Sequence, residues 1–441
     1  MMMRTGVALG VLFAAGMALA LNPIIQEGEF LSDPAPRVGP DGALWLFGSR
    51  DEDVKRYCSY ANDVLETRDL VNWIRHPGIL ISKGEGDAVP ASDEQLYAPD
   101  AIFHNGQWAL FYCMPDRAHR EGVAFAERPT GPFAGARGLA GCDQIDPSVF
   151  RDDDGTLYYF WGQFALRGGI LKADLSGLEP GSVRTGIIDE ARHNFHEGVQ
   201  LTKRNGIYYL VFADIGRRRR PTCIGYATSD KPFGPYVYRG VIVDNYGCDP
   251  QSWNNHGGIV EYKGRWYVVY HRSTNGSNTM RKACVEPIAF DADGFIAEVE
   301  TTSNGAGPEL DPFVSTPARI ACVMSGNVRI VTLPDRHERL GNIRAGDTAT
   351  WRYFNVSHDV KRVALRVVSK RGGVIEMRDV TGASYGRVAV PAGDGQSVTE
   401  AELTLTRTFP TGRRAVAFAF HGRPNEDLFD LESWRFLGKR E

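Results

Sequence analysis

A pattern of hydrophobic and polar positions recurs five times between residues 33 and 271. In each copy an acidic or polar residue opens an apolar stretch, a turn follows, and a strand rich in aromatic residues completes the unit. A glycine falls eight or nine residues after the opening residue in four copies, and earlier in the second. Each copy predicts a β-hairpin. The opening residues are Asp33, Asp100, Asp146, Glu197 and His256.

A second recurring element follows each hairpin, a short strand with small residues that leads into a turn rich in Gly, Pro or Asp. Its copies occupy residues 59–73, 122–133, 168–180, 223–236 and 281–295. Hairpins and strand pairs together predict five units of four strands, and no helical periodicity of comparable length competes. Radial repetition of such units predicts a five-bladed β-propeller over residues 21–315, with the opening residue of every unit facing one central funnel.

The remaining residues, 320–441, lack this repeat. Alternating strands such as 363–369 and 415–420 are separated by Gly and Asp turns, and they predict a small antiparallel β-sandwich of the jelly-roll kind. Residues 303–313 are rich in Gly, Pro and Ser and predict the linker. The fold class expected for the chain is all-β.

Composition and charge limit the partners. Of the 441 residues 43% are hydrophobic and 24% charged, which is typical of a globular protein and excludes a disordered or fibrous one. With 50 basic and 54 acidic residues the formal net charge is −4. We therefore expect no binding to nucleic acid or to a membrane surface, and we expect a monomer.

The N-terminus indicates export. Arg4 precedes an apolar stretch that ends in the small-residue sequence Ala18-Leu19-Ala20, so residues 1–20 are interpreted as a secretory signal and the protein as secreted or periplasmic. A membrane-tethered or lipid-modified N-terminus is the alternative. The seven cysteines form no Cys-x-x-Cys pair, and their odd number leaves at least one free thiol. One or two disulfides remain open in an oxidising compartment.

Three unit openings are carboxylates at matching places, namely Asp33, Asp146 and Glu197. Like charges crowded on one axis disfavour full ionisation, so one acid is expected to keep its proton near neutral pH. Cleavage of a glycosidic bond requires this division, because one carboxylic acid protonates the leaving oxygen and one carboxylate activates water or attacks carbon. The alternative is that these strand-start residues only cap turns, as Asp-Pro often does.

The segments that carry these acids resemble glycoside hydrolase family 43, whose members are five-bladed propellers. The resemblance rests on LSDPAPRV, DPSVFRDDDGTLYY and HEGVQLTKRNGIYYLVF. It implies that Asp33 is the general base, that Glu197 is the general acid, and that Asp146 orients the acid and tunes its pKa. The family is inverting, which implies that the acid and base carboxyls stand about 6.5–9.5 Å apart with a water between them.

Five further residues are candidate ligands of the substrate or of an ion. Arg281 matches a family arginine that reaches into the sugar subsite, His256 matches a family position, and Tyr97 stands where the family often has tryptophan, although core packing is the alternative for Tyr97. Asp100 is a candidate substrate contact as the acidic opening residue of the second unit. His271 resembles a histidine that helps to hold a calcium or sodium ion at the propeller axis, mostly through water, and no organic cofactor is expected.

The C-terminal part is more weakly similar to family 6 carbohydrate-binding modules, through residues 372–390 and 412–436. In those modules a late polar region lies near a sugar cleft or a structural calcium, and Asn425 and Asp430 match it. The paired aromatic platform of such clefts has no assignable counterpart. A sugar-binding domain and a purely structural one therefore both remain open.

The expected function is that of a secreted hydrolase that removes arabinofuranosyl or xylosyl units from plant polysaccharides or oligosaccharides by single displacement. A sugar-binding propeller without catalysis is one alternative, and a family member that acts on galactofuranoside or galactan linkages is another. The basic run Arg217–Arg220 predicts either a solvated loop or a funnel rim that meets acidic sugar substituents.

Overall fold

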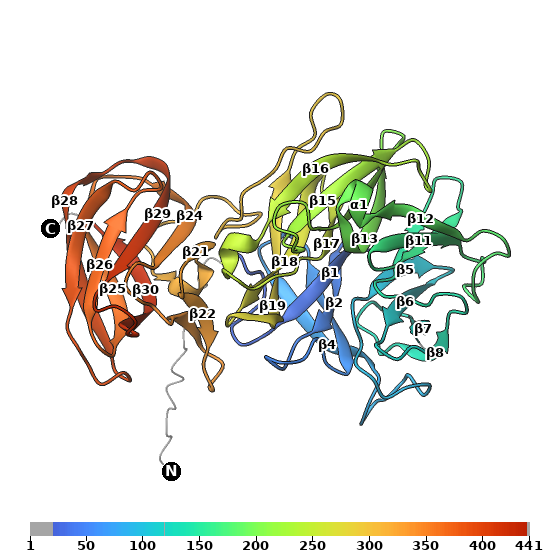
Figure 1. Cartoon of the computed structure of the whole chain (residues 1–441), viewed down its shortest axis with the longest axis horizontal. Helices are drawn as coiled ribbons and strands as arrows, with labels where there is room; N and C mark the ends of the chain where they lie inside the picture. The colour runs from blue at the N-terminus through green and yellow to red at the C-terminus, as the bar shows by residue number, and fades with distance from the viewer. Residues whose placement is uncertain (1–20, 119, 439–441) are drawn as a thin grey trace, which may run out of the picture.

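The computed structural model describes residues 21–118 and 120–438, and the predicted signal in residues 1–20 lies outside them. Within the described residues the chain is almost entirely β-structure, arranged as blades around an axis at one end of the molecule and a separate β-sandwich at the other (Figure 1). None of the helices in the described part is long and apolar enough to cross a membrane. All seven cysteines lie in this part, and all are buried and unpaired.

Four blades are meanders of four antiparallel strands, as the sequence predicts. Blade I contains β1 (Leu31–Val38), β2 (Leu44–Arg50), β3 (Ala61–Thr67) and β4 (Trp73–Ile81), and blade II contains β5 (Asp100–His104), β6 (Gln107–Cys113), β7 (Glu121–Ala126) and β8 (Ala134–Gly138). Blade III contains β9 (Ser148–Arg151), β10 (Leu157–Trp161), β11 (Ala165–Ile170) and β12 (Arg184–Asp189), and blade IV contains β13 (Phe195–Arg204), β14 (Ile207–Asp214), β15 (Cys223–Ser229) and β16 (Val237–Asp244). The short helices α1 (Glu190–His193) and η1 (Tyr246–Cys248) lie in connections.

The fifth blade differs from the prediction, because it has three strands and not four: β17 (Gly257–Tyr262), β18 (Arg265–Thr274) and β19 (Ser277–Ile288). After β19 the chain makes a single bridge, Phe290 to Ile296. It then turns to blade IV, where the Val299 N–H donates to the Ile242 carbonyl. β19 instead pairs in parallel with β1, at Lys282 and Leu31, and this pairing joins blades V and I into one seven-stranded sheet.

Local sequence explains the hairpins and the core. Asn205 and Gly206 both have positive φ, as a two-residue type I′ turn requires, and they join β13 to β14. Along the strands the apolar side chains alternate toward the neighbouring blades, and one buried cluster fills each of the five spaces between blades. Between blades II and III, for example, the rings of Phe111 and Tyr159 lie 5.2 Å apart.

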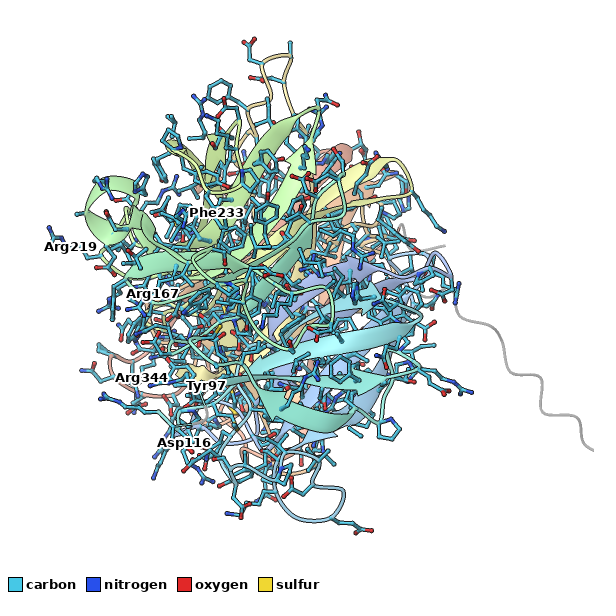
Figure 2. The ribbon with its side chains drawn as sticks, turned by 90° about the vertical axis from the view of Figure 1, so that its right-hand side faces the viewer. Tyr97, Asp116, Arg167, Arg219, Phe233 and Arg344 are labelled. Carbon is cyan, nitrogen blue, oxygen red and sulfur yellow. The ribbon has the colours of Figure 1, made fainter. Side chains whose placement is uncertain are left out.

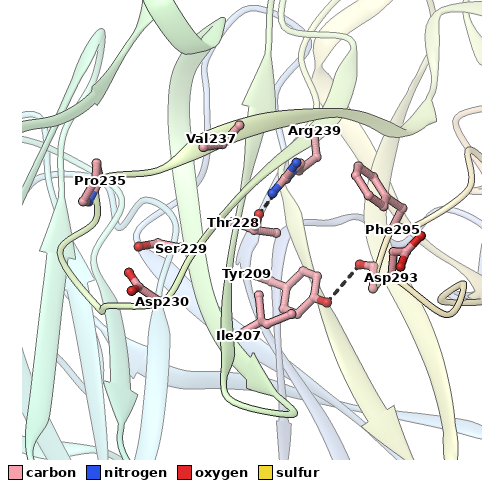
Figure 3. A pocket seen from close by; sticks show the side chains of 11 residues that line it. Ile207, Tyr209, Thr228, Ser229, Asp230, Pro235, Val237, Arg239, Asp293 and Phe295 are labelled. Carbon is pink, nitrogen blue, oxygen red and sulfur yellow. Dashed lines mark hydrogen bonds between the residues drawn. The ribbon is translucent and has the colours of Figure 1, made fainter.

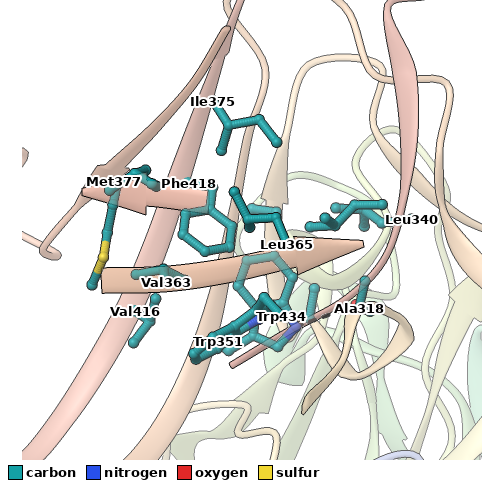
Figure 4. Packing of buried hydrophobic residues seen from close by; sticks show 14 of the residues in the cluster. Ala318, Leu340, Trp351, Val363, Leu365, Ile375, Met377, Val416, Phe418 and Trp434 are labelled. Carbon is teal, nitrogen blue, oxygen red and sulfur yellow. Dashed lines mark hydrogen bonds between the residues drawn. The ribbon is translucent and has the colours of Figure 1, made fainter. Parts of the chain in front are cut away.

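The C-terminal domain is a sandwich of two sheets. One contains β20 (Thr316–Pro317), β22 (Arg329–Thr332), β23 (Glu338–Gly341), β25 (Val360–Ser369), β28 (Val398–Phe409) and β30 (Phe429–Leu437), and the other contains β21 (Val323–Ser325), β24 (Thr348–Val356), β26 (Gly373–Arg378), β27 (Ser384–Val390) and β29 (Gly412–His421). A 3-10 helix, η2 (Ala318–Ile320), follows β20. Trp351 and Trp434 pack edge to face at 5.8 Å in the core between the sheets (Figure 4).

Candidate active site

A cavity of about 410 Å³ lies where the first strands of the blades begin. Tyr97, one of its lining residues, is on the same side of the propeller as Arg167 and Arg219 (Figure 2). The structure brings together most of the site residues predicted from the sequence. Six of them line the cavity: Asp33, Tyr97, Asp146, Glu197, His256 and Arg281.

Backbone irregularities aim the three acids at the axis. Asp33 and Asp146 have φ of 53° and 62°, a left-handed conformation at the start of each blade. The pairing of β1 with β2 shifts register directly after Ser32, and the pairing of β13 with β14 shifts register on both sides of Glu197. Gly198 follows with φ of 67°, and a Cβ there would lie 2.8 Å from the ring of His256. Glycine at position 198 therefore allows the backbone of β13 to lie close to the His256 ring.

Asp33 is surrounded by groups that stabilise its charge. Its Oδ1 accepts a hydrogen bond of 2.8 Å from Nη1 of Arg281, and its Oδ2 accepts one of 2.7 Å from the Ser49 hydroxyl. Burial alone would raise the pKa of this carboxyl, but Arg281, His271 and His256 outweigh burial and lower it to about 2. Asp33 is therefore a carboxylate throughout the neutral range.

Arg281 is itself fixed by a residue that the sequence analysis missed. Its Nε and Nη2 donate to the two carboxylate oxygens of Asp51, both at 2.8 Å, and its guanidinium lies 5.1 Å from the centre of the Tyr57 ring. Such a bidentate pair sets the plane of the arginine fork. The remaining nitrogen, Nη1, is thereby directed at Asp33.

Asp146 and Glu197 form the second part of the site. Glu197 accepts a hydrogen bond of 2.7 Å from Nε2 of Gln163 on its Oε2. Burial and the negative charges of Glu197 and Asp33 hold the pKa of Asp146 well above its usual range. Asp146 therefore retains its proton under conditions in which Asp33 is ionised.

His256 and His271 both approach Asp33, but only His256 lines the cavity. His271 is fully buried behind it: its Nδ1 accepts the Asp33 N–H at 3.1 Å, and its Nε2 lies 2.6 Å from Oδ1 of Asn254. Both ring nitrogens are thus engaged, and burial holds the pKa of His271 far below its usual value.

The hydrogen bonds of His271 exclude direct ligation of a cation by its ring. A histidine that ligates a cation directly needs a free ring nitrogen, and His271 has none. Among residues 21–118 and 120–438 no group of three or more His, Cys, Asp or Glu side chains could hold an ion. His271 therefore supports the backbone of Asp33, and the expected calcium or sodium ion, held mostly through water, stays a prediction.

Asp100 also departs from the prediction. It is buried and does not line the cavity. Its Oδ1 accepts a hydrogen bond of 2.8 Å from Nε of Arg37. Its Oδ2 accepts one of 2.8 Å from the Val149 N–H and also pairs with the Arg37 guanidinium. Because Arg37 belongs to β1 and Val149 to β9, Asp100 joins three blades below the site and is not available to a substrate.

Several residues that line the cavity come from loops, and the sequence analysis did not predict a role for them. Tyr57 and Trp253 are 38% and 39% exposed, so the cavity has two aromatic side chains that reach solvent. Gln163 and Arg120 contribute polar groups from the connections after β10 and before β7. No repeat or motif marks these positions, because the loops differ in length from blade to blade.

The basic run Arg217–Arg220 does not line the cavity. All four residues are exposed; Arg217 pairs with Glu298 at 2.6 Å and Arg218 with Asp244 at 2.7 Å. Arg219 projects from the propeller on the side that also carries Tyr97 (Figure 2). The first half of the run thus stabilises its own loop, as the solvated-loop interpretation expects.

One pocket on the propeller axis thus holds an ionised carboxylate, Asp33, a carboxyl with a raised pKa, Asp146, and a third carboxyl, Glu197, and such a set of acids is typical of a glycosidase. The sequence model of Glycosyl hydrolases family 43 matches residues 20–296. The chain belongs to this family. The predicted family, enzyme class and all-β fold are thereby confirmed, whereas the resemblance of the sandwich to carbohydrate-binding modules remains a prediction.

Relatives of known structure or activity extend over both domains. The chain is 26% identical to a xylosidase/arabinosidase of Thermoclostridium stercorarium, over 92% of this chain and 97% of that protein. It also resembles the crystal structure of an arabinoxylan arabinofuranohydrolase from Bacillus subtilis in complex with cellotetraose, with a TM-score of 0.56, 26% identity, and coverage of 96% and 98%.

A third relative is matched by about two thirds of this chain. It is a β-xylosidase/α-arabinofuranosidase from a compost microbial metagenome, solved with xylotriose in a calcium-free form. The TM-score is 0.54 at 26% identity, and the match covers 64% of this chain and 97% of that one.

Proposed function

We propose that this protein removes arabinofuranosyl or xylosyl units from plant polysaccharides or oligosaccharides, with inversion at the anomeric carbon. The observation that carries the proposal is the contrast between Asp33, with a pKa of about 2, and Asp146, whose pKa is held well above its usual range, in a cavity that Glu197 also lines. The activities named for the relatives support this substrate class. A volume of about 410 Å³ suits a few sugar rings at most.

In the proposed reaction Asp33 takes a proton from a water molecule whose oxygen attacks the anomeric carbon. Glu197 donates a proton to the departing glycosidic oxygen as the carbon–oxygen bond breaks. In this proposal Asp146, which lines the same cavity, orients Glu197. Gln163 holds Oε2 of Glu197 in place, so the other oxygen is left to face the leaving group.

The proposed substrate contacts are Arg281, His256 and Tyr97. Arg281 uses two nitrogens on Asp51 and one on Asp33, so its role includes the charge of the base as well as any sugar hydroxyl. Tyr97 is half-buried, and Trp253 and Tyr57 add more exposed aromatic faces on the cavity wall. Aromatic faces of this kind are suited to the apolar side of a sugar ring. Residues 1–20 support export, and we propose a secreted or periplasmic monomer.

The test is hydrolysis of 4-nitrophenyl α-L-arabinofuranoside, β-D-xyloside and β-D-galactofuranoside by the wild-type protein. Turnover of either of the first two supports the proposal, and turnover of the galactofuranoside alone would replace the substrate class. NMR of the released sugar should show the inverted anomer first. Asp33→Ala and Glu197→Ala should each lose nearly all activity while keeping the circular dichroism spectrum. Calorimetric binding of xylo-oligosaccharides without any product would instead indicate a sugar-binding propeller.

A further inference from the structure

Neighbouring residues of β19 point in opposite directions and reach different parts of the molecule. Arg281 lines the catalytic cavity, whereas Lys282 is fully buried on the other side of the strand. Nζ of Lys282 lies 2.6 Å from Oε1 of Glu338, donates to the Gln26 carbonyl at 2.9 Å, and stands 4.8 Å from the centre of the Phe30 ring. Since Glu338 belongs to β23 of the sandwich, the partner of Lys282 comes from the other domain.

The same carboxylate also holds the segment that leads into β1. Oε1 of Glu338 accepts the Gly28 N–H at 3.0 Å, and the Glu338 N–H donates to Oε2 of Glu27 at 3.0 Å. Three residues after Gly28, Leu31 pairs with Lys282 across the seam between β1 and β19. Asp33 follows two residues later. One sandwich side chain therefore contacts β19, which carries Arg281, and the segment that leads into β1, which carries Asp33.

Burial of the Lys282 ammonium costs free energy unless a carboxylate neutralises its charge. A lysine ammonium removed from water must have a partner, and burial lowers the pKa of Lys282 to about 8 although Glu338 opposes the effect. Within the described residues Glu338 is the carboxylate paired with Lys282. Loss of its charge leaves Lys282 either uncharged or displaced, and displacement moves the strand that carries Arg281.

We infer that Glu338 is a positioning residue of the catalytic site, through which the sandwich holds β19 and residues 26–31 so that Nη1 of Arg281 stays on Oδ1 of Asp33. This inference rests on the proposed function, in which Asp33 is the general base. It assigns the C-terminal domain a part in the geometry of the active site that does not depend on whether the domain binds sugar.

The test compares Glu338→Gln with a matched control, Glu376→Gln. Glu376 is also a buried glutamate of the sandwich, in ion pairs with Arg378 and Arg387, but these partners belong to the sandwich alone. Both variants are expected to lower the melting temperature. Only Glu338→Gln is expected to lower kcat, by about tenfold with KM nearly unchanged, because a small misplacement of catalytic groups is costly.

A second readout separates positioning from stability. If Arg281 withdraws from Asp33, the pKa of Asp33 rises, so the acidic limb of kcat/KM moves to higher pH in Glu338→Gln and stays in place in Glu376→Gln. The inference is overturned if the two variants have the same kcat and if their acidic limbs lie at the same pH. If Glu338→Gln does not fold, Arg336→Met replaces it: Arg336 is exposed and donates to the Gly28 carbonyl at 2.6 Å. A twofold to threefold loss of kcat is then expected, and wild-type kcat would contradict the inference.

Hydrogen exchange makes the test independent of activity. Peptides that cover residues 26–33 and 277–288 should exchange faster in Glu338→Gln, or in Arg336→Met if that variant replaces it, than in Glu376→Gln, even if the wild-type protein hydrolyses none of the glycosides. Unchanged exchange in these peptides overturns the positioning role, whereas an inactive wild type overturns the proposed function alone. The two failures are therefore distinguishable.

Discussion

Replacing Arg281 with glutamine tests whether one guanidinium keeps Asp33 ionised. In the wild type the pKa of Asp33 is about 2, against 3.8 for an ordinary aspartate. This difference corresponds to about 2 kcal/mol in favour of the carboxylate. Burial is the largest influence on the group and acts in the opposite direction, and Arg281 is the largest influence that lowers the pKa. Without Arg281 we therefore expect the pKa of Asp33 to rise above 3.8.

The assay is kcat/KM for an activated glycoside from acid to neutral pH. The wild type should show no acidic limb from Asp33 within the range in which it stays folded, while Arg281→Gln should show one above pH 3.8. Arg167→Gln is the matched control, since Arg167 is a half-buried arginine paired with Asp143 at 2.5 Å on the same side of the propeller (Figure 2). An Arg281→Gln profile that lacks an acidic limb, as the wild-type profile does, would refute the assignment of Arg281 as the group that ionises Asp33.

The sign of the stability effect follows from the same shift. Because the pKa of Asp33 is lower in the folded protein, its ionisation stabilises the fold above pH 3.8, and this contribution is lost as pH falls through about 2. Arg281→Gln should therefore melt well below the wild type at neutral pH. The gap between the two melting temperatures should narrow as the pH falls below 3.8, and a gap that is constant with pH would contradict the reasoning.

Two further predictions concern other groups near the cavity. Burial raises the pKa of Glu121 to about 8 from an ordinary 4.5, so its neutral form stabilises the fold and stability should fall as pH rises toward 8; Glu121→Gln should flatten the melting temperature between pH 6 and 9, and a wild-type slope would contradict this. Trp253→Ala should raise KM for xylo-oligosaccharides severalfold with little change in kcat, as expected for a binding face. Phe295→Ala is its control, because Phe295 is 41% exposed but lines a different cavity, of about 320 Å³, between blade IV and the turn after β19 (Figure 3); equal KM values in the two variants would remove Trp253 from substrate binding.

The repeat in the sequence was sufficient to predict the blades and most of the acids at the axis, because each opening residue precedes an apolar strand that must enter the core. Asp33, Asp146, Glu197 and His256 all reach the cavity for this reason. Asp100 occupies the same place in the repeat, yet it pairs with Arg37. The pattern of hydrophobic positions fixes where a strand starts, but it does not indicate which buried charge a neighbouring blade supplies.

The partners of the acids could not be read from the sequence, since they come from distant segments. Asp51 lies 230 residues from Arg281 and determines which way its guanidinium points. Gln163 and Trp253 stand in connecting loops, where residue type carries no periodic signal. The missing fourth strand of blade V has a similar origin. β19 pairs with β1, which is distant in the sequence, and this pairing closes the ring of blades; the local hydrophobic pattern does not indicate it.

Lys282, the buried lysine of β19, is another residue whose partner comes from a distant segment, in this case from the sandwich. A relative that is covered over 97% of its own length by 64% of this chain is a shorter protein than this one. In a propeller without the sandwich, a lysine at the position of Lys282 would lack the carboxylate that neutralises it here. The charge at this position is therefore intelligible only with Glu338 in place, and the second domain is part of the frame that holds Asp33 and Arg281 together.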